Sequence, residues 1–109
     1  MSVGVREADH VSIEPASVIP EGLVAYSRTP EFTSDTVPAA LLKAHATKED
    51  VWGRIEIVEG ELLYRVIDPR RKTWSTVLAK DNPGVVEPTI LHEVEPRGAS
   101  RFFVEFFRK

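Results

Sequence analysis

Residues 52–67, WGRIEIVEGELLYRVI, carry the pattern that decides the fold. In the first half of this stretch, Ile55 and Ile57 alternate with Arg54 and Glu56. Successive side chains of a strand point to opposite faces, so this two-residue period predicts one apolar face and one charged face. The stretch therefore predicts a half-buried strand.

Glu59 and Gly60 interrupt the alternation and predict a two-residue hairpin turn. The segment 37–45 is rich in Ala and Leu and would also suit a helix, but its short length and its β surroundings favour a strand. Other β-branched and aromatic runs are separated by turn residues at Asp68-Pro69, at 81–84 and at 96–98. About eight strands are predicted, at 23–26, 37–45, 52–58, 62–67, 73–78, 85–86, 90–94 and 101–107.

The chain of 109 residues has the length of one domain, and this strand spacing predicts an all-β sandwich or small barrel. Residues 1–17 are polar and lack a clear period, so they predict an N-terminal arm that can add one edge strand. Residues 18–109 are predicted to form the barrel domain. His10 lies in the arm, where we expect it to face solvent.

The composition excludes several classes of function. The net charge of -3 argues against nucleic acid as a partner, and the one basic run, 70–72, reads as a solvated turn. The absence of cysteine excludes disulfides, zinc–thiolate sites and a cysteine nucleophile. No apolar run reaches the length of a membrane span, and the N-terminus lacks the apolar core of a secretory signal. We therefore expect a cytoplasmic protein with no membrane partner.

Two histidines are the strongest candidates for chemistry. His92 shares a face of its predicted strand with Ile90 and Val94, and His45 shares one with Leu41. If these apolar faces point inward, both imidazoles enter the barrel. Imidazole is a common ligand of divalent transition metals, so one zinc, iron, manganese or nickel ion is a possible cofactor. The alternative is a pair of pocket histidines hydrogen-bonded to the backbone.

A firm metal site needs a third ligand, usually a carboxylate. Glu49 has the parity of His45, although it also suits an exposed turn. Glu105 is flanked by aromatic residues, and a half-buried carboxylate needs a partner, either a cation such as Arg54 or a metal. The candidate pocket residues are His45, Trp52, Arg54, His92 and Glu105, and the candidate metal ligands are His45, His92, Glu105 and Glu49.

The segment 44–62, with its His-x-x-Lys, Trp-Gly and Gly-x-Leu motifs, resembles the core of the TehB-like domain family. Flanking pieces at 26–30, 37–39, 88–96 and 103–107 agree with this resemblance. The family is related to the tellurite-resistance protein TehB and includes the small YeaR-type proteins. The resemblance implies a cupin-like double-stranded β-helix, or jelly-roll barrel, with a pocket that holds His45 and His92.

The sequence departs from the cupin metal motif. That motif has two histidines one residue apart, a glutamate seven residues before a glycine, and a further histidine. Here the position seven before Gly60 is Gly53, which leaves space where a ligand would stand, and no second histidine follows His45. Long TehB proteins also carry a methyltransferase domain, but no segment resembles a nucleotide-binding glycine loop. Neither S-adenosylmethionine nor a nucleotide is therefore expected as a cofactor.

Three functions remain open at this stage. The first is a binding domain that holds a metal ion or a small polar or anionic ligand near His45 and His92. The second is a metal-dependent cupin enzyme of the dioxygenase or isomerase type, which requires Glu105 or Glu49 to reach the histidines. The third is a homodimeric interaction domain that pairs through an exposed sheet edge.

Overall fold

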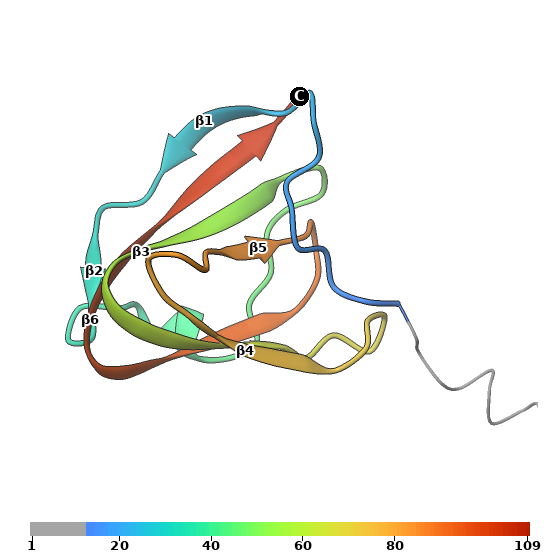
Figure 1. Ribbon diagram of the computed structural model, residues 1–109. Coiled ribbons are helices and arrows are strands. Elements are labelled where there is room, and N and C mark those ends of the chain that lie inside the picture. The colour runs from blue at the N-terminus through green and yellow to red at the C-terminus, as the bar shows by residue number, and fades with distance from the viewer. Residues whose placement is uncertain (1–12) are drawn as a thin grey trace, which may run out of the picture.

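The computed structural model describes residues 13–109, and two long strands organise it. β3 (Trp52–Val66) and β6 (His92–Arg108) run antiparallel along their whole length, from the Trp52–Phe107 pair to the Val66–His92 pair. Figure 1 shows both strands passing together through a bend, so that one half of the ribbon lies above the other. This paired, folded-over ribbon is the double-stranded β-helix that the family resemblance implied.

The shorter elements extend this ribbon on both sides. The sheet order is β1-β6-β3-β4, with β2 also paired to β6 and β5 also paired to β3, all antiparallel. One short 3₁₀ turn, η1, lies between β2 and β3. The prediction of a single all-β, cupin-like jelly roll is confirmed. The remaining bounds are β1 Val24–Arg28, β2 Phe32–Thr33, η1 Ala39–Leu42, β4 Trp74–Leu78 and β5 Gly84–Val86.

The predicted hairpin at Glu59-Gly60 is wrong, because β3 continues through these residues as a bulged bend. Gly60 has a φ of 77°, which suits a bulge as well as a hairpin turn. The predicted turn at 96–98 is likewise a bend inside β6, with Gly98 at a φ of 75°. Four of the eight predicted strands therefore merge into two long ones.

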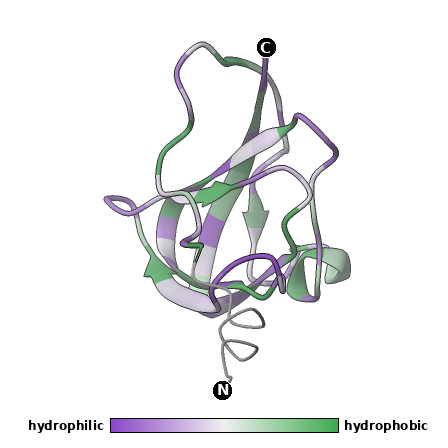
Figure 2. Cartoon of the chain, turned by 90° about the vertical axis from the view of Figure 1, so that its right-hand side faces the viewer, coloured by the Kyte–Doolittle hydropathy of each residue, from purple (hydrophilic) through white to green (hydrophobic). Residues whose placement is uncertain are grey.

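The predicted strand at 37–45 is also wrong. Pro38 precedes a 3₁₀ turn over Ala39–Leu42, and only His45 pairs with another chain segment, through a single bridge to His92. The Leu41 amide donates a hydrogen bond of 3.0 Å to the Pro38 carbonyl, which closes the turn, and Leu41 packs against the core. Figure 2 shows this turn as a coil at the side of the sheet.

The core lies between the two halves of the bent ribbon. As the alternation predicts, Ile55 and Ile57 are buried, whereas Arg54 and Glu56 remain partly exposed on the other face. Figure 2 shows hydrophobic and hydrophilic positions alternating along the strands. The core cluster consists of Ile55, Ile57, Leu62, Tyr64, Val66, Leu78, Val86, Ile90, Val94, Phe102 and Val104.

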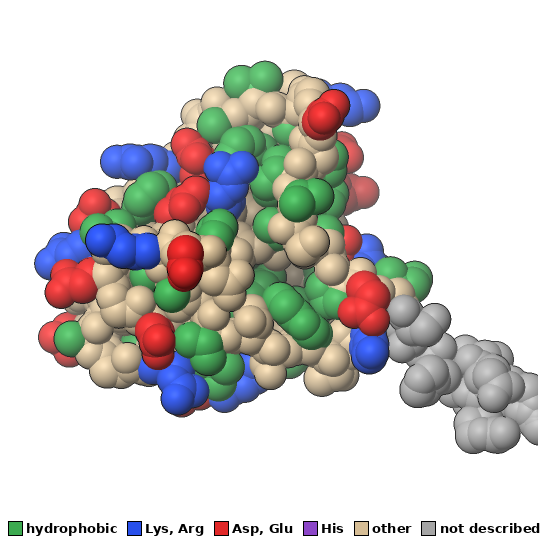
Figure 3. All heavy atoms as spheres, viewed as in Figure 1, with side chains coloured by type: hydrophobic (Ala, Val, Ile, Leu, Met, Phe, Trp, Pro, Cys, Tyr) green, Lys and Arg blue, Asp and Glu red, His purple; other side chains and the backbone are tan. Residues whose placement is uncertain are grey.

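In the view of Figure 3 the surface has no large patch of one charge, because acidic and basic side chains are mixed around the bend of β3 and β6. Residues 13–17 form no strand, but the Ile13 carbonyl accepts a hydrogen bond of 2.7 Å from the Lys72 backbone amide. The expectation for His10 lies outside the described residues. Between residues 13 and 109, no helix is long and apolar enough to cross a membrane.

Candidate functional site

A cavity of about 250 Å³ opens between the two halves of the sheet, beside η1. Its wall is almost entirely apolar and comes from β2, η1, β3, β5 and β6, so the bend that shapes the fold also shapes the cavity. Its polar side chains are two imidazoles and two threonine hydroxyls. The lining residues are Thr29, Phe32, Pro38, Ala40, Leu41, His45, Thr47, Ile55, Val86, His92, Val94, Phe102, Val104 and Phe106.

His45 and His92 meet at one part of this wall. Their backbones exchange two hydrogen bonds, from His45 N to His92 O and from His92 N to His45 O, each of 2.8 Å. Directly paired residues of an antiparallel bridge place their side chains on the same face. The ring centroids are accordingly 5.6 Å apart, with the ring planes near perpendicular at 81°. The structure thus brings together the two histidines that the sequence singled out.

His92 is held neutral. Its side chain is buried, at 4% exposure, and burial lowers the pKa of the imidazole from 6.5 to about 4, although the hydrogen bond to the Ile90 carbonyl acts in the opposite direction. Nδ1 lies 3.2 Å from that carbonyl oxygen. Because a carbonyl oxygen only accepts hydrogen bonds, this contact assigns the proton to Nδ1 and leaves a lone pair on Nε2. At neutral pH the His92 ring, which lines the cavity, therefore carries an unprotonated Nε2 that can accept a hydrogen bond or ligate a metal.

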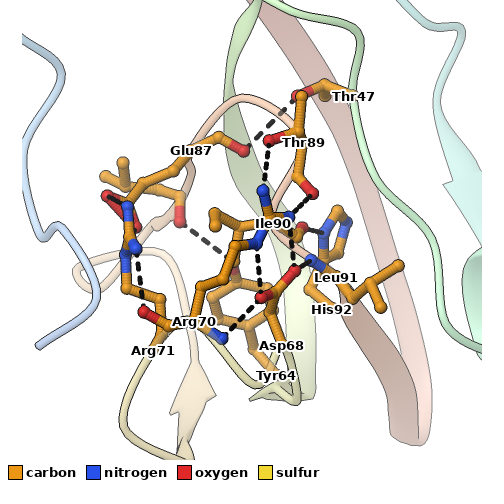
Figure 4. Close-up of polar contacts among 11 residues, drawn as sticks. Thr47, Tyr64, Asp68, Arg70, Arg71, Glu87, Thr89, Ile90, Leu91 and His92 are labelled. Carbon is orange, nitrogen blue, oxygen red and sulfur yellow. Dashed lines mark hydrogen bonds and ion pairs between the residues drawn. The ribbon is translucent and has the colours of Figure 1, made fainter. Parts of the chain in front are cut away.

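An ion pair between the buried Asp68 and the exposed Arg70 fixes the segment that leads into His92. Asp68 is 2% exposed, and its carboxylate receives Arg70 Nε at 2.8 Å, Arg70 Nη2 at 2.7 Å and the Leu91 amide at 3.0 Å (Figure 4). Arg70 also donates to the Thr89 carbonyl at 2.6 Å. Hydrogen bonds from the Arg70 guanidinium hold the pKa of the Asp68 carboxyl well below its usual range. The pair clamps residues 89–91 onto the end of β3.

Two further contacts reinforce this clamp. Arg71 pairs with Glu87 at 2.7 Å, which ties the same turn to the chain before Thr89. Tyr64, whose ring centroid lies 5.7 Å from that of His92, donates its hydroxyl proton to the Val85 carbonyl at 2.9 Å. Burial raises the pKa of Tyr64, so the phenol stays protonated. Figure 4 shows this network beside His92.

The interpretation of the basic run 70–72 as a solvated turn is incomplete, because Arg70 and Arg71 hold the chain that leads into His92. One local signal could have indicated it, because an aspartate two residues before Arg70 can accept that residue's backbone amide in an Asx turn. This bond is present, from Arg70 N to Asp68 Oδ1 at 2.8 Å. The contacts to Thr89 and Leu91 join segments about twenty positions apart, so no local pattern predicts them.

The two candidate carboxylates do not line the cavity. Glu105 lies on the outer face of β6, where its carboxylate is 4.0 Å from Arg54, the cation that the sequence offered as its simpler partner. Glu49 is exposed in the turn before β3. Over residues 13–109, no group of three or more His, Asp or Glu side chains is placed to hold a metal ion. The donor set here is two imidazoles without a carboxylate, which does not fit a cupin metal centre.

Trp52 and Arg54 also lie outside the cavity wall. Both are on the outer side of β3, and the Arg54 guanidinium lies 4.7 Å from the Phe107 ring centroid. The expectation of open space at Gly53 is wrong. A Cβ atom at this position would lie 3.3 Å from Val86 Cβ and 3.5 Å from Val104 Cγ1, so valines fill the place of the cupin glutamate.

Comparison with known proteins agrees with this architecture. The model of the TehB-like domain family matches residues 27–104. The crystal structure of TehB from Haemophilus influenzae superposes with a TM-score of 0.73 at 23% identity, over 82% of this chain and 32% of that protein. The chain thus spans about a third of the length of TehB.

A second crystal structure, of a protein from Escherichia coli strain K12, superposes with a TM-score of 0.72 at 22% identity, over 83% of this chain and 94% of that protein. At these identities the structural likeness establishes the fold alone. No curated protein sequence matched the chain. The family match covers most of the described barrel, and the chain belongs to the TehB-like domain family.

Proposed function

We propose that this chain is a small-molecule binding domain whose ligand occupies the apolar cavity and donates one hydrogen bond to His92 Nε2. The observation that carries the proposal is a neutral, buried imidazole facing an apolar cavity of about 250 Å³. Binding sites for small molecules combine apolar walls with a few placed polar groups in this way. An empty apolar cavity of roughly 150 Å³ accommodates benzene, so this one has room for a substituted ring.

The apolar, uncharged wall of the cavity indicates which class of ligand can bind there. A bare oxyanion would need cations, but Arg54 lies on the outer face and His92 is uncharged at neutral pH. An uncharged apolar body with a hydroxyl or N–H group meets both requirements inside this cavity, because the body fits the wall and the proton meets the lone pair of Nε2. We therefore do not propose tellurite as the ligand of this cavity. The cytoplasm remains our proposed location, with which the lack of cysteine is compatible.

Calorimetric titration with 4-methylphenol and with toluene tests the proposal. The two molecules share an apolar body, and only the phenol donates a hydrogen bond. We expect 4-methylphenol to bind wild type roughly fivefold to tenfold more tightly than toluene, the value of one buried hydrogen bond. In His92→Phe, which keeps an aromatic ring but loses the acceptor, this preference should disappear. Equal binding of both molecules to wild type, or binding of neither, would contradict the proposal.

A divalent metal is the second candidate, favoured by the convergence of two imidazoles with ring centroids 5.6 Å apart. Zinc, iron, manganese or nickel could be held by His45 and His92, with the ligand completing the coordination. A cupin-type enzyme is not favoured, since neither Glu105 nor Glu49 reaches the cavity. Elemental analysis of untagged wild type and His92→Ala distinguishes the two candidates. Near-stoichiometric metal in wild type that is lost in the variant would favour the metal over the organic ligand.

A homodimer stays a separate proposal, which β1 supports. All five residues of this edge strand are exposed, including Val24 at 63% and Tyr26 at 43%. Unpaired strand edges readily pair with another strand. Light scattering on the purified chain would report the dimer, and a monomer at micromolar concentration would dismiss it.

A further inference from the structure

A second cavity adjoins the first and shares part of its wall. It also measures about 250 Å³ and is more open. His45, Thr47 and Phe106 line both cavities, so the deep apolar cavity and the outer one meet at these residues. The outer cavity is lined by Tyr26, His45, Ala46, Thr47, Lys48, Val51 and Phe106.

The outer cavity carries positive charge. Lys48 lines it and forms no ion pair with any other residue in the described range 13–109. The Arg108 guanidinium lies 4.0 Å from the ring centroid of Tyr26, whose side chain also lines this cavity. Among residues 13–109, neither an aspartate nor a glutamate lines either cavity. Glu49 and Asp50 follow Lys48 in the same turn but do not contribute to the wall.

We infer that the ligand is a small amphiphilic monoanion, with an apolar body in the inner cavity and a carboxylate in the outer cavity beside Lys48. The inference rests on the proposed function and adds the second end of the ligand. His45 lies between the two ends, since it lines both cavities and its ring is 5.6 Å from that of His92. Small hydroxyaromatic acids have this layout, with a hydroxyl group to meet His92 and a carboxylate to meet Lys48.

The test compares 4-hydroxyphenylacetate with its neutral isostere 4-hydroxyphenylacetamide, and both with 4-methylphenol. Partly exposed ion pairs contribute modestly, so we expect the acid to bind wild type about threefold to fivefold more tightly than the amide. The preference should weaken with added salt, which screens exposed charges. Lys48→Gln should remove it, and the lysine is exposed, so the variant should fold, as circular dichroism would verify.

Lys80→Gln is the matched control, because Lys80 is exposed and lines neither cavity. This variant should keep the full preference for the acid. Binding of 4-methylphenol together with equal affinities for acid and amide would overturn the inference and leave the proposed function standing. If Lys48→Gln and Lys80→Gln reduced the preference for the acid equally, the inference would be overturned as well, because the preference would then depend on net charge alone. Failure of all three molecules to bind would overturn the proposed function and the inference with it.

Discussion

His92 is the residue on which the account depends, and its protonation connects the site to stability. The native imidazole titrates at about 4, whereas an unfolded histidine titrates near 6.5. Between these two values the unfolded chain binds the extra proton and the native chain does not. The stabilisation is therefore complete above pH 6.5 and is lost as pH falls toward 4.

We predict that lowering the pH from 7.5 to 4 removes about 3 kcal/mol of stability through this residue alone. Urea unfolding of wild type and His92→Gln across this range measures the effect as a difference, because other groups titrate equally in both proteins. The wild-type curve should fall more steeply. Parallel curves would mean that His92 is not buried neutral.

The clamp between Asp68 and Arg70 belongs to the next scale, because it joins the end of β3 to the segment before β6. Asp68→Asn keeps the shape of the side chain but removes the charge that holds Arg70 and the Leu91 amide. We predict a loss of about 2 kcal/mol, in the range for charged hydrogen bonds at a buried site. Thermal unfolding at pH 7 measures it, with Glu14→Gln as the control.

Glu14 pairs with Lys72 at 3.3 Å between two exposed side chains, so its substitution should cost less than about 0.5 kcal/mol. The dependence of stability on acidic pH gives a second test of the Asp68–Arg70 pair. The lowered pKa of Asp68 stabilises the protein above its unfolded pKa of 3.8, and this contribution is lost as pH falls below that value. Asp68→Asn should lack this part of the acid-induced loss and should therefore lose less stability than wild type over the same pH range. A variant as stable as wild type at pH 7 would refute the clamp.

The bends in β3 and β6 make a matched pair of glycines. At Gly60 a Cβ atom would clash with the Ala99 carbonyl oxygen, whereas at Gly98 it would have nothing within 4 Å. Both have positive φ, so alanine costs roughly 1 kcal/mol at either position through backbone strain. We predict that Gly60→Ala loses at least about 2 kcal/mol more than Gly98→Ala in chemical denaturation. Similar losses would mean that β3 and β6 do not approach each other closely at this bend.

The same glycines explain what the sequence could and could not predict. Period-two alternation correctly placed Ile55 and Ile57 in the core and Arg54 outside it, because burial of a strand face is a local property. A glycine at positive φ fits a hairpin and a bulged bend equally well, and the choice depends on the contact of Gly60 with β6. Strand positions were therefore predictable, but their continuity was not.

In the candidate site, too, local patterns predicted some features, whereas others depend on contacts between distant segments. Parity in 90–94 correctly directed His92 inward, whereas His45 reaches the cavity from a bridge after a 3₁₀ turn and not from the predicted strand. Glu105 could not be excluded from sequence, because flanking aromatics give it partial burial on either face. Glu105 pairs with Arg54 across the sheet, and this register places its side chain on the outer face. Register depends on pairing between distant strands, which no local pattern reveals.

At the scale of the whole molecule, one bent ribbon produces both the core and the cavity. The apolar face of β3 and β6 fills most of the space between the two halves, and the remainder opens as a chamber beside η1. The clamp at Asp68 fixes the chain entering His92, and the bridge to His45 places the second ring beside it. The cavity is thus a consequence of the topology, and the two histidines give it its chemistry.

The most direct test of this account is the ¹⁵N resonance of the His92 ring nitrogens at pH 7, measured before and after addition of 4-methylphenol. The account predicts one protonated nitrogen, Nδ1, and one unprotonated nitrogen, Nε2, whose resonance shifts when the phenol is added and stays in place when toluene is added. Two protonated nitrogens in the free protein, or an Nε2 resonance that ignores the phenol at saturating concentration, would contradict it.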